Sequence, residues 1–419
     1  MNNHVGVCVG DTILSHLLWA DDLILFSDSL GGIKKQLDGL FAFCAKNRMI
    51  VNELKTKIMV FGNGPKGDVM FNGKLLKWVN EYKYLGNIIN SIKQVNGDMF
   101  KENSHYLCNK ARGAIFSFFK KTKSYGTLPP KLMVQAYKTL IQPILLYGSD
   151  IWGVSKYMCE AIDKVCLFFI RCILRVKPST SRLMCFGELG IVPPSVLAKI
   201  NVLNSHLRLK QMSNNSLESI VLQELYDFVD VGFNNIVSSI QSMATLYGID
   251  LESCNYSTES TNALKQIVKT DYIQSWFVNV CENNSSLRLY KLFKSNYVFE
   301  PYLSCIKIDR HRHALSKFRC SSHFLEIERA RHKNVIPPIW ERNCPFCPFA
   351  VDDELHLLLY CSQNREHRDT FLKIVFDIQP EIARMHHLDK FNSIMSSQDS
   401  VILKALGKFI FESFKARNI

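Results

Sequence analysis

Apolar residues recur along the first thirty positions in short runs, which is typical of β-strands. Residues 5–9, 13–18 and 23–26 are three such runs, and together they predict a β-hairpin over residues 5–28. The stretch between the last two runs, Trp19-Ala-Asp-Asp22, is too short to form anything but a tight turn. The sequence therefore places two adjacent acidic residues between two hydrophobic strands.

The next segments alternate between helical and extended spacing. A helix is predicted from Gly31-Gly32 to Asn47-Arg48, because its apolar residues share one face. Strands are predicted at residues 57–61 and 82–89, with a turn at Phe71-Asn-Gly73. An α+β arrangement over residues 1–90 follows. The apolar face of the predicted helix consists of Ile33, Leu37, Leu40, Phe41 and Cys44.

Beyond residue 90 the apolar spacing becomes helical. We expect Pro143 and Gly148 to end the second of three long helices, and we expect helices with polar loops from about residue 195 to 300. An amphipathic helix is predicted near residues 400–416. The three long helices are predicted at residues 98–122, 130–146 and 157–177, and the polar loops at 213–216 and 281–286.

Composition indicates a globular protein. With 419 residues, of which 47% are hydrophobic, the chain can form two or three domains. It contains no apolar run of about eighteen residues and no N-terminal signal pattern, so we expect no membrane partner and a location inside the cell, in the nucleus or the cytoplasm. Most of the 14 cysteines are expected to be reduced and buried, among them Cys108, Cys166, Cys172 and Cys281.

The formal net charge of +13 favours an anionic partner, and the positive excess is concentrated in one region. Residues 91–190 contain fifteen Lys and Arg against six Asp and Glu, and residues 116–123 (FSFFKKTK) mix aromatic rings with lysines. A solvated surface over a phenylalanine core and a lysine face against nucleic acid phosphates are both compatible with this pattern. The candidate nucleic-acid contacts are Lys110, Arg112, Lys120, Lys121 and Lys123, continued by Lys131 and Lys138.

The adjacent carboxylates of Asp21 and Asp22 repel one another and need a compensating cation if they are buried. A two-metal phosphoryl-transfer site supplies that cation: Mg²⁺ ions neutralise the carboxylates, one activating a primer hydroxyl and the other holding a triphosphate. The simpler alternative is a solvent-exposed Asp-Asp turn of an ordinary sheet protein. Asp21 and Asp22 are therefore candidate catalytic and Mg²⁺-binding residues.

The residues around this pair carry a family resemblance. Residues 17–27 (LLWADDLILFS) closely resemble the catalytic hairpin of reverse transcriptases from non-LTR (LINE-type) retrotransposons. Three further segments follow in the order found in that family, over about seventy residues: 41–45 (FAFCA), 51–62 (VNELKTKIMVFG) and 82–88 (YKYLGNI). The resemblance implies an RNA-directed DNA polymerase whose partners are an RNA template and an RNA/DNA primer duplex.

The resemblance extends to individual residues. Asp21 looks like the metal-binding aspartate and Asp22 its neighbour, while Trp19 stands where the family more often has Tyr or Phe near the incoming nucleotide. Lys55 and Lys57 flank the threonine of the family's KTK segment, and a solvent-facing strand edge is their alternative. The segment that grips the primer strand in the family is matched by Tyr84, Leu85 and Gly86, and residues 147–153 (YGSDIWG) resemble a segment after the thumb that we interpret as structural.

Two parts of such a polymerase are not recognised in the sequence. Family members need a third metal-binding aspartate and basic residues of the fingers, both of which precede the Ala-Asp-Asp turn. Asp11 does not serve, because it lies in a Gly-Asp-Thr turn of the hairpin itself. We therefore expect a truncated polymerase that does not polymerise alone.

A Cys/His cluster near the C-terminus has the ligand types that zinc prefers. Cys344, Cys347, His356 and Cys361 form Cys-x2-Cys-x8-His-x4-Cys, and residues 352–354 could cap a helix that carries the histidine. Three buried thiols with a chance histidine are the alternative. Many non-LTR elements end in a similar pattern (R.CP.C…DE.H.L..C), which implies a structural Zn²⁺. His367 is a possible substitute ligand, and basic residues between 310 and 333, Arg312 and Arg319 among them, are candidate phosphate contacts.

Together these observations predict an α+β fold. A partial polymerase palm of hairpin, helix and strands precedes a mostly α-helical thumb and a C-terminal region with a small zinc-knuckle-like module. The alternatives to a truncated polymerase are a non-catalytic nucleic-acid-binding remnant or host-recruited protein, and a zinc-stabilised interaction protein. The predicted segments are 1–90 (palm), 91–195 (thumb-like basic helices), 196–305 (helical connector), 306–375 (basic segment and Cys/His module) and 376–419 (helical tail).

Overall fold

The computed structural model describes residues 5–62, 64, 66–91, 99–126, 128–282 and 287–417. Helices predominate and the strands are short, in outline the expected α+β class, while the palm assignment stays a prediction. The chain divides into two compact units, and the five-segment division made from the sequence stays a prediction beside them. Unit 1 consists of Met1–Asn109, Leu146–Ala161 and Leu197–Val268, and unit 2 of Lys110–Leu145, Ile162–Val196 and Lys269–Ile419.

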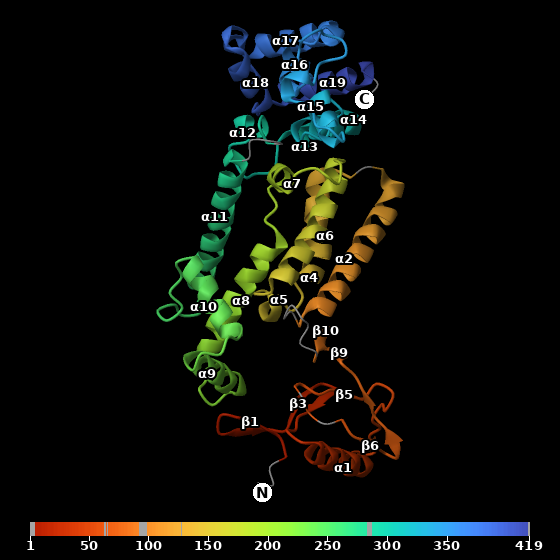
Figure 1. Cartoon of the computed structure of the whole chain (residues 1–419), viewed down its shortest axis with the longest axis vertical. Coiled ribbons are helices and arrows are strands. Elements are labelled where there is room, and N and C mark those ends of the chain that lie inside the picture. The colour runs from red at the N-terminus through yellow and green to blue at the C-terminus, as the bar shows by residue number, and fades with distance from the viewer. Residues whose placement is uncertain are drawn as a thin grey trace. The chain divides into compact units, whose positions relative to one another are not determined.

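The N-terminal residues form two consecutive hairpins, where the sequence predicted one (Figure 1). The apolar run at 13–18 is divided at Ser15, so that its halves belong to different hairpins. Gly10 and Ala20 adopt positive φ values of 55° and 54°, which allow the chain to reverse within two residues. The strands are β1 (Val7–Val9) paired with β2 (Thr12–Leu14), and β3 (His16–Trp19) paired with β4 (Asp22–Leu25), all antiparallel.

Helix α1 (Leu30–Asn47) confirms the helix predicted from apolar spacing. The Ser29 side chain accepts a hydrogen bond from the Gly32 N–H, and Arg48 ends the helix in the left-handed conformation. The helix buries Leu37 in the small core of this part of unit 1. The other buried members of that core are Ile58, Val69, Phe71 and Leu76.

The predicted single strand at residues 82–89 is wrong. The structure places a hairpin there, because Leu85 and Gly86 both have positive φ, at 44° and 84°. Two consecutive residues of this kind form a turn whose twist suits an antiparallel strand pair. The hairpin strands are β9 (Glu81–Tyr84) and β10 (Asn87–Asn90).

The remaining strands are only two residues long. The strand predicted at 57–61 is limited to β5, which pairs in parallel with β8. The turn predicted at residues 71–73 is confirmed, with Asn72 and Gly73 at φ 50° and 75°. These strands are β5 (Lys57–Ile58), β6 (Met70–Phe71), β7 (Lys74–Leu75) and β8 (Lys77–Trp78).

The helices of the basic region follow the predicted spacing, with one exception at Pro143. The helical path continues through this proline, although it was expected to end the helix. The five residues before Gln142 adopt the wider π-helical geometry, and the Gln142 N–H donates to the Tyr137 carbonyl five residues earlier. The segments are α2 (Lys101–Thr122), η1 (Lys123–Tyr125), α3 (Pro130–Ala136), η2 (Tyr137–Ile141), α4 (Gln142–Leu145), α5 (Ser149–Trp152) and α6 (Lys156–Leu174).

The middle of the chain is helical, as predicted. The polar stretch expected at 281–286 begins later than predicted, since Cys281 and Glu282 still belong to α11, and residues 283–286 lie outside the described residues. In the described part of the chain no single helix is long and apolar enough to span a membrane. Helices α7 and α8 together have sufficient length and apolar composition, but the chain bends by 73° between them. The helices are α7 (Arg182–Leu189), α8 (Pro194–Lys210), α9 (Leu217–Asp230), α10 (Ile236–Leu246), α11 (Thr258–Glu282) and α12 (Tyr290–Phe293).

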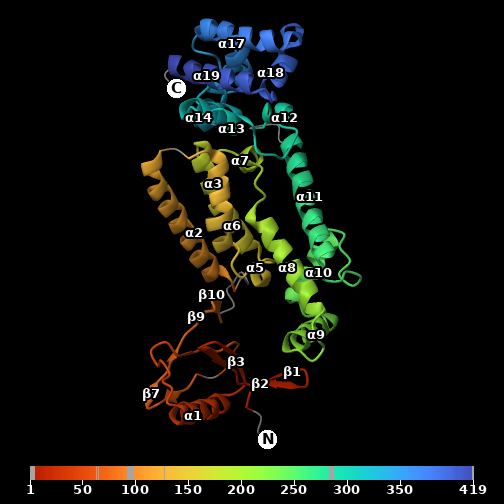
Figure 2. The same cartoon turned by 180° about the vertical axis from the view of Figure 1, so that it is seen from behind.

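The C-terminal helices gather around α19 (Ser400–Ala416), which confirms the predicted amphipathic helix (Figures 1 and 2). Its apolar face, including Leu406 and Ile410, is buried, and Phe409 stacks on Phe371 with ring centroids 5.2 Å apart. The surrounding elements are α13 (Tyr302–Cys305), α14 (Asp309–Arg319), α15 (Glu326–Arg329), η3 (Ala330–His332), η4 (Ile339–Glu341), α16 (Glu354–Leu359), η5 (Ser362–Asn364), α17 (Arg365–Ile378), η6 (Pro380–Arg384) and α18 (His387–Met395).

A buried ion network lies in unit 2. The Arg319 guanidinium donates to Glu188 at 2.9 Å and lies 2.8 Å from Glu300, which also pairs with Lys294. Burial alone would raise the pKa of Glu188. The Arg319 and Lys294 cations outweigh this effect and hold that pKa below its ordinary value. The expectation that Arg319 and Arg312 contact phosphates is wrong, because they are 3% and 4% exposed and serve internal partners.

We predict that Arg319→Ala lowers the free energy of unfolding by about 3–5 kcal/mol, because the buried Glu188 loses its paired guanidinium and Glu300 keeps only Lys294. The matched control is Arg329→Ala, which removes an arginine whose side chain is 67% exposed and, among the described residues, forms an ion pair only with Glu326. That control is expected to cost less than about 1 kcal/mol. Urea unfolding followed by circular dichroism measures both, and equal losses would contradict the prediction.

Candidate metal and nucleic-acid sites

The paired aspartates lie where the sequence predicted, at the tip of a tight antiparallel hairpin. Ala20 and Asp21 form the two-residue turn, and Asp22 pairs with Trp19 at the start of β4. Both carboxylates are exposed, and Trp19 is 68% exposed beside them. Among the residues that the structure describes, no third His, Cys, Asp or Glu ligand joins this pair. The hairpin therefore presents two accessible carboxylates, and its Mg²⁺ site stays a prediction.

The lysines of the KTK segment occupy different surroundings. Lys55 is exposed, and its carbonyl accepts a hydrogen bond from the Tyr82 hydroxyl at 3.4 Å. Lys57 is half-buried, and its ammonium donates to the Leu54 carbonyl at 2.6 Å. The Lys57 side chain is thus held by a local backbone carbonyl, whereas the Lys55 side chain faces solvent.

The Leu85-Gly86 turn is held by a residue that sequence reasoning treated only as structural. The Tyr147 hydroxyl donates to the Leu85 carbonyl at 2.7 Å. A Cβ at Gly86 would lie 2.7 Å from the Tyr147 ring, and the φ of Gly86 is +84°. The tyrosine is itself fixed, because the Trp152 indole N–H donates to its carbonyl at 2.9 Å. Tyr84, beside this turn, is half-buried.

Helices α2 and α6 carry an exposed face that combines positive charge with aromatic rings. Arg112, Phe116 and Lys120 lie one above the other on α2 at four-residue intervals, and Lys164 and Phe168 do so on α6. The rings of Phe116 and Phe168 are 60% and 37% exposed, with centroids 5.8 Å apart. We call these five residues the basic-aromatic face.

Other side chains of this region separate into core and surface. Phe118 and Phe119 pack against the buried Phe169, as the core interpretation predicted, but Phe116 is exposed and does not fit it. The predicted contacts Lys110, Arg112, Lys120, Lys121 and Lys123 are all exposed. Together α2 and α6 contain eight Lys and Arg and three Asp and Glu, and one of these three, Asp163, is buried. The sequence missed Lys164 and Phe168, whose four-residue spacing on a predicted helix was the available signal.

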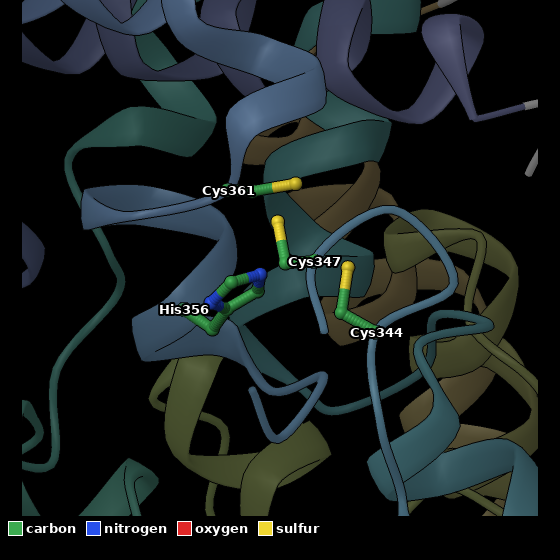
Figure 3. A group of neighbouring side chains, drawn as sticks. All are labelled: Cys344, Cys347, His356 and Cys361. Atoms are coloured by element: carbon green, nitrogen blue, oxygen red, sulfur yellow. The ribbon is translucent and has the colours of Figure 1, made fainter. Parts of the chain in front are cut away.

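The Cys/His cluster forms a compact centre, in which three sulfur atoms and an imidazole ring face one another (Figure 3). The ligand atoms of Cys344, Cys347, His356 and Cys361 all lie within 4.8 Å of one another. Tetrahedral zinc with Zn–S bonds of about 2.3 Å places its ligand atoms roughly 3.5–4 Å apart, so a small contraction completes the geometry. The buried His356 Nε2 has no hydrogen-bond partner among the described residues. A metal such as zinc fits this donor set.

Local structure explains how the ligands are positioned. The Asp353 side chain caps α16 by accepting from the His356 N–H at 2.8 Å, which confirms the predicted acidic cap. His356 lies in the first turn of α16, and Cys361 follows its C-terminal end. The candidate substitute His367 lies on α17 and does not belong to the group. The centre is thus built around one short helix and the Cys344–Cys347 turn.

The electrostatic surroundings differ between the ligands. Burial raises the pKa of Cys344 to about 12, so this thiol is protonated until a metal displaces the proton. Burial also tends to raise the pKa of Cys347, but a hydrogen bond donated by the Ser362 N–H and another shared with the Ser362 hydroxyl outweigh this effect and lower that pKa. Burial lowers the pKa of His356, which favours the neutral imidazole that binds metal.

Comparison with known proteins gives a partial likeness. Over 153 residues the chain is 27% identical to a protein of Caenorhabditis elegans described as an uncharacterized transposon-derived protein. These residues are 36% of this chain and 52% of that protein, so the match spans about half of the relative's length. No protein-family model matches the chain, and no solved structure matches it significantly. The likeness is consistent with an origin in a transposable element.

We predict that the purified chain binds about one zinc ion and that His356→Ala abolishes stoichiometric binding, because the tetrahedral set loses its only nitrogen. Elemental analysis after gel filtration measures the metal content. His367→Ala is the matched control and is expected to retain zinc, while His356→Cys is expected to restore a four-ligand site. Full zinc content in His356→Ala would show that the metal is held elsewhere.

Proposed function

We propose that the chain is part of the RNA-directed DNA polymerase of a non-LTR retrotransposon, to which it contributes the end of the palm and the thumb. The observation that carries this proposal is the hairpin tip, where Asp21 and Asp22 are adjacent and exposed between two hydrophobic strands. The likeness to a transposon-derived protein supports the class of genetic element. The order of the segments that resemble this polymerase family supports the chemistry.

The hairpin itself does the positioning. Asp22 is held by its pairing with Trp19, and Asp21 by the two-residue turn, so the strands rather than a long loop set where both carboxylates point. Mg²⁺, when bound, would activate the primer hydroxyl and neutralise the triphosphate. The exposed Trp19 offers a ring beside the pair, on which a base can stack. The family resemblance implies that a third carboxylate is required for a complete site.

The basic-aromatic face supports contact with a nucleic acid duplex. Its cations would neutralise backbone phosphates, a contact that gives affinity with little sequence specificity. The exposed ring of Phe116 lies between Arg112 and Lys120 on α2, and that of Phe168 lies one turn from Lys164 on α6, so both can pack against sugars or an unpaired base. This arrangement suits a thumb that follows a template–primer duplex.

A second candidate function is a non-catalytic nucleic-acid-binding protein, either a remnant of the element or a host-recruited descendant. The favouring observation is that, in the described ranges, Asp21 and Asp22 gain no third ligand, whereas the basic-aromatic face needs none. A zinc-stabilised interaction protein without nucleic acid would leave the exposed cations of α2 and α6 unexplained.

We predict that the chain binds an RNA–DNA primer–template duplex with a steep salt dependence. Replacing Lys120, Lys121 and Lys123 together by Gln is expected to weaken binding and to reduce the slope of log affinity against log salt by about 2–3, because each lost phosphate contact removes roughly 0.9. Fluorescence anisotropy at several salt concentrations measures the slope.

The matched control for this experiment replaces three exposed lysines of α19, Lys404, Lys408 and Lys415, by Gln. It changes the net charge equally but leaves α2 and α6 unaltered. The slope is expected to stay near that of the wild-type chain. Equal effects of both triple variants would reduce the interaction to net charge alone, and the absence of duplex binding would overturn both candidate functions.

We predict no primer extension by this chain alone with Mg²⁺ and deoxynucleotides. Two carboxylates without a third ligand bind Mg²⁺ weakly and do not hold a triphosphate. The signal is expected to equal that of Asp21→Asn, measured on the same primer–template by denaturing gel. Extension by the wild-type chain above this control would demonstrate a complete metal site and contradict the expectation.

A further inference from the structure

Arg417, which follows helix α19, reaches the Cys/His centre. Its Nη2 donates to the Cys361 Sγ at 2.8 Å and to the Cys344 Sγ at 3.2 Å. Its Nη1 donates to the Asp352 carboxylate at 2.6 Å. The residue is 7% exposed, so these contacts are shielded from water. A single guanidinium thus joins two of the four candidate metal ligands.

The orientation of this guanidinium is determined by several neighbours. Asp352 accepts from Arg417 through one carboxylate oxygen and from the Glu326 N–H, at 2.9 Å, through the other. Phe346 stands between the two cysteines of the Cys-x2-Cys turn. The centroid of its ring lies 5.4 Å from the Arg417 guanidinium carbon. Arg417 is therefore held by a carboxylate, a ring and two sulfurs.

The contacts of Arg417 with the sulfurs balance the charge of a metal-loaded centre. Three thiolates, one neutral imidazole and a divalent metal together carry one net negative charge in a largely buried place. N–H groups that point at the sulfurs stabilise such a centre, and an arginine supplies the opposite charge as well. Lysine would place a single point charge there and could not donate to Asp352 and to a sulfur in one plane.

The position of Arg417 depends in turn on the packing of α19. Leu406, Ile410 and Phe414 are buried on the apolar face of this helix, and Phe409 stacks on Phe371 of α17. Because Arg417 directly follows α19, its guanidinium lies at the sulfurs only when α19 is packed in this position. The contact of the Arg417 guanidinium with the two sulfurs therefore links the metal centre to α19. Metal binding then stabilises the packing of α19, and the packing of α19 in turn strengthens metal binding.

We propose that Arg417 is a positioning residue of the zinc centre and that metal binding is coupled to the seating of α19. This inference does not depend on the proposed polymerase function. A competing arrangement is that the guanidinium occupies the place of the metal, in which case removing it would strengthen zinc binding. Removing the guanidinium weakens zinc binding in the first arrangement and strengthens it in the second.

The test measures zinc affinity of the full chain by competition with a chromophoric chelator. Arg417→Gln is expected to bind zinc about 10–100-fold more weakly, and Arg417→Lys to lie between it and the wild-type chain. Lys415→Gln is the matched control, because it removes one positive charge from an exposed position at the end of α19 and is expected to leave the affinity unchanged. Unchanged or tighter binding by Arg417→Gln overturns the proposal.

Two further measurements separate positioning from a general loss of folding. Co²⁺-substituted Arg417→Gln is expected to keep the tetrahedral spectrum with thiolate charge-transfer bands, since all four ligands remain. Hydrogen exchange of the α19 amides is expected to slow when zinc is added to the wild-type chain, and much less in Arg417→Gln. Equal slowing in both chains overturns the coupling, and loss of the tetrahedral spectrum overturns the positioning role. A wild-type chain that binds no zinc would overturn both the metal assignment and this proposal.

Discussion

Compensation of buried positive charge is the constraint on which unit 2 depends. Arg319 and Arg417 are both buried, and each meets a carboxylate: Glu188 for the first and Asp352 for the second. Removing one partner of such a pair costs several kcal/mol, so each arginine restricts how its helix can pack. Part of the chain's basic excess therefore stabilises the interior. An anionic partner can be attracted only by cations that stay on the surface, such as Lys120 and Lys164.

This constraint also shows what the sequence could and could not predict. The Asn72-Gly73 turn and the Asp353 cap were predicted, because each depends on a few neighbouring residues. The ligand set of the Cys/His centre was predictable from spacing for the same reason. Contacts between distant residues were not. Arg319 meets Glu188 across 131 positions, Arg417 meets Cys344 across 73, and Tyr147 meets Leu85 across 62, and hydrophobic spacing indicates a buried face without naming its partner.

At the Leu85-Gly86 turn the family resemblance identifies a segment but does not give the full reason why position 86 is a glycine. The family resemblance assigned Gly86 to the segment that grips the primer strand, where a glycine lets the backbone come close to a phosphate. The structure provides a second, sufficient reason, since a Cβ there would collide with the Tyr147 ring and the backbone has positive φ. Gly86 alone is therefore no argument for a nucleic-acid contact. The turn and the segment beginning at Tyr147 are better treated as one structural element of unit 1.

The same reasoning limits what the Cys/His centre can do. Three of its four ligands are buried, and the arginines around it already serve internal acceptors: Arg368 donates to the Cys361 carbonyl and Arg342 to the Ile327 carbonyl. Glu354, at the start of α16, is likewise held by Arg288 and His323. A free-standing zinc knuckle keeps its basic side chains available for nucleic acid, whereas here they close the module against neighbouring helices. These contacts favour a structural metal, which leaves the basic-aromatic face of α2 and α6 as the stronger candidate for nucleic acid binding.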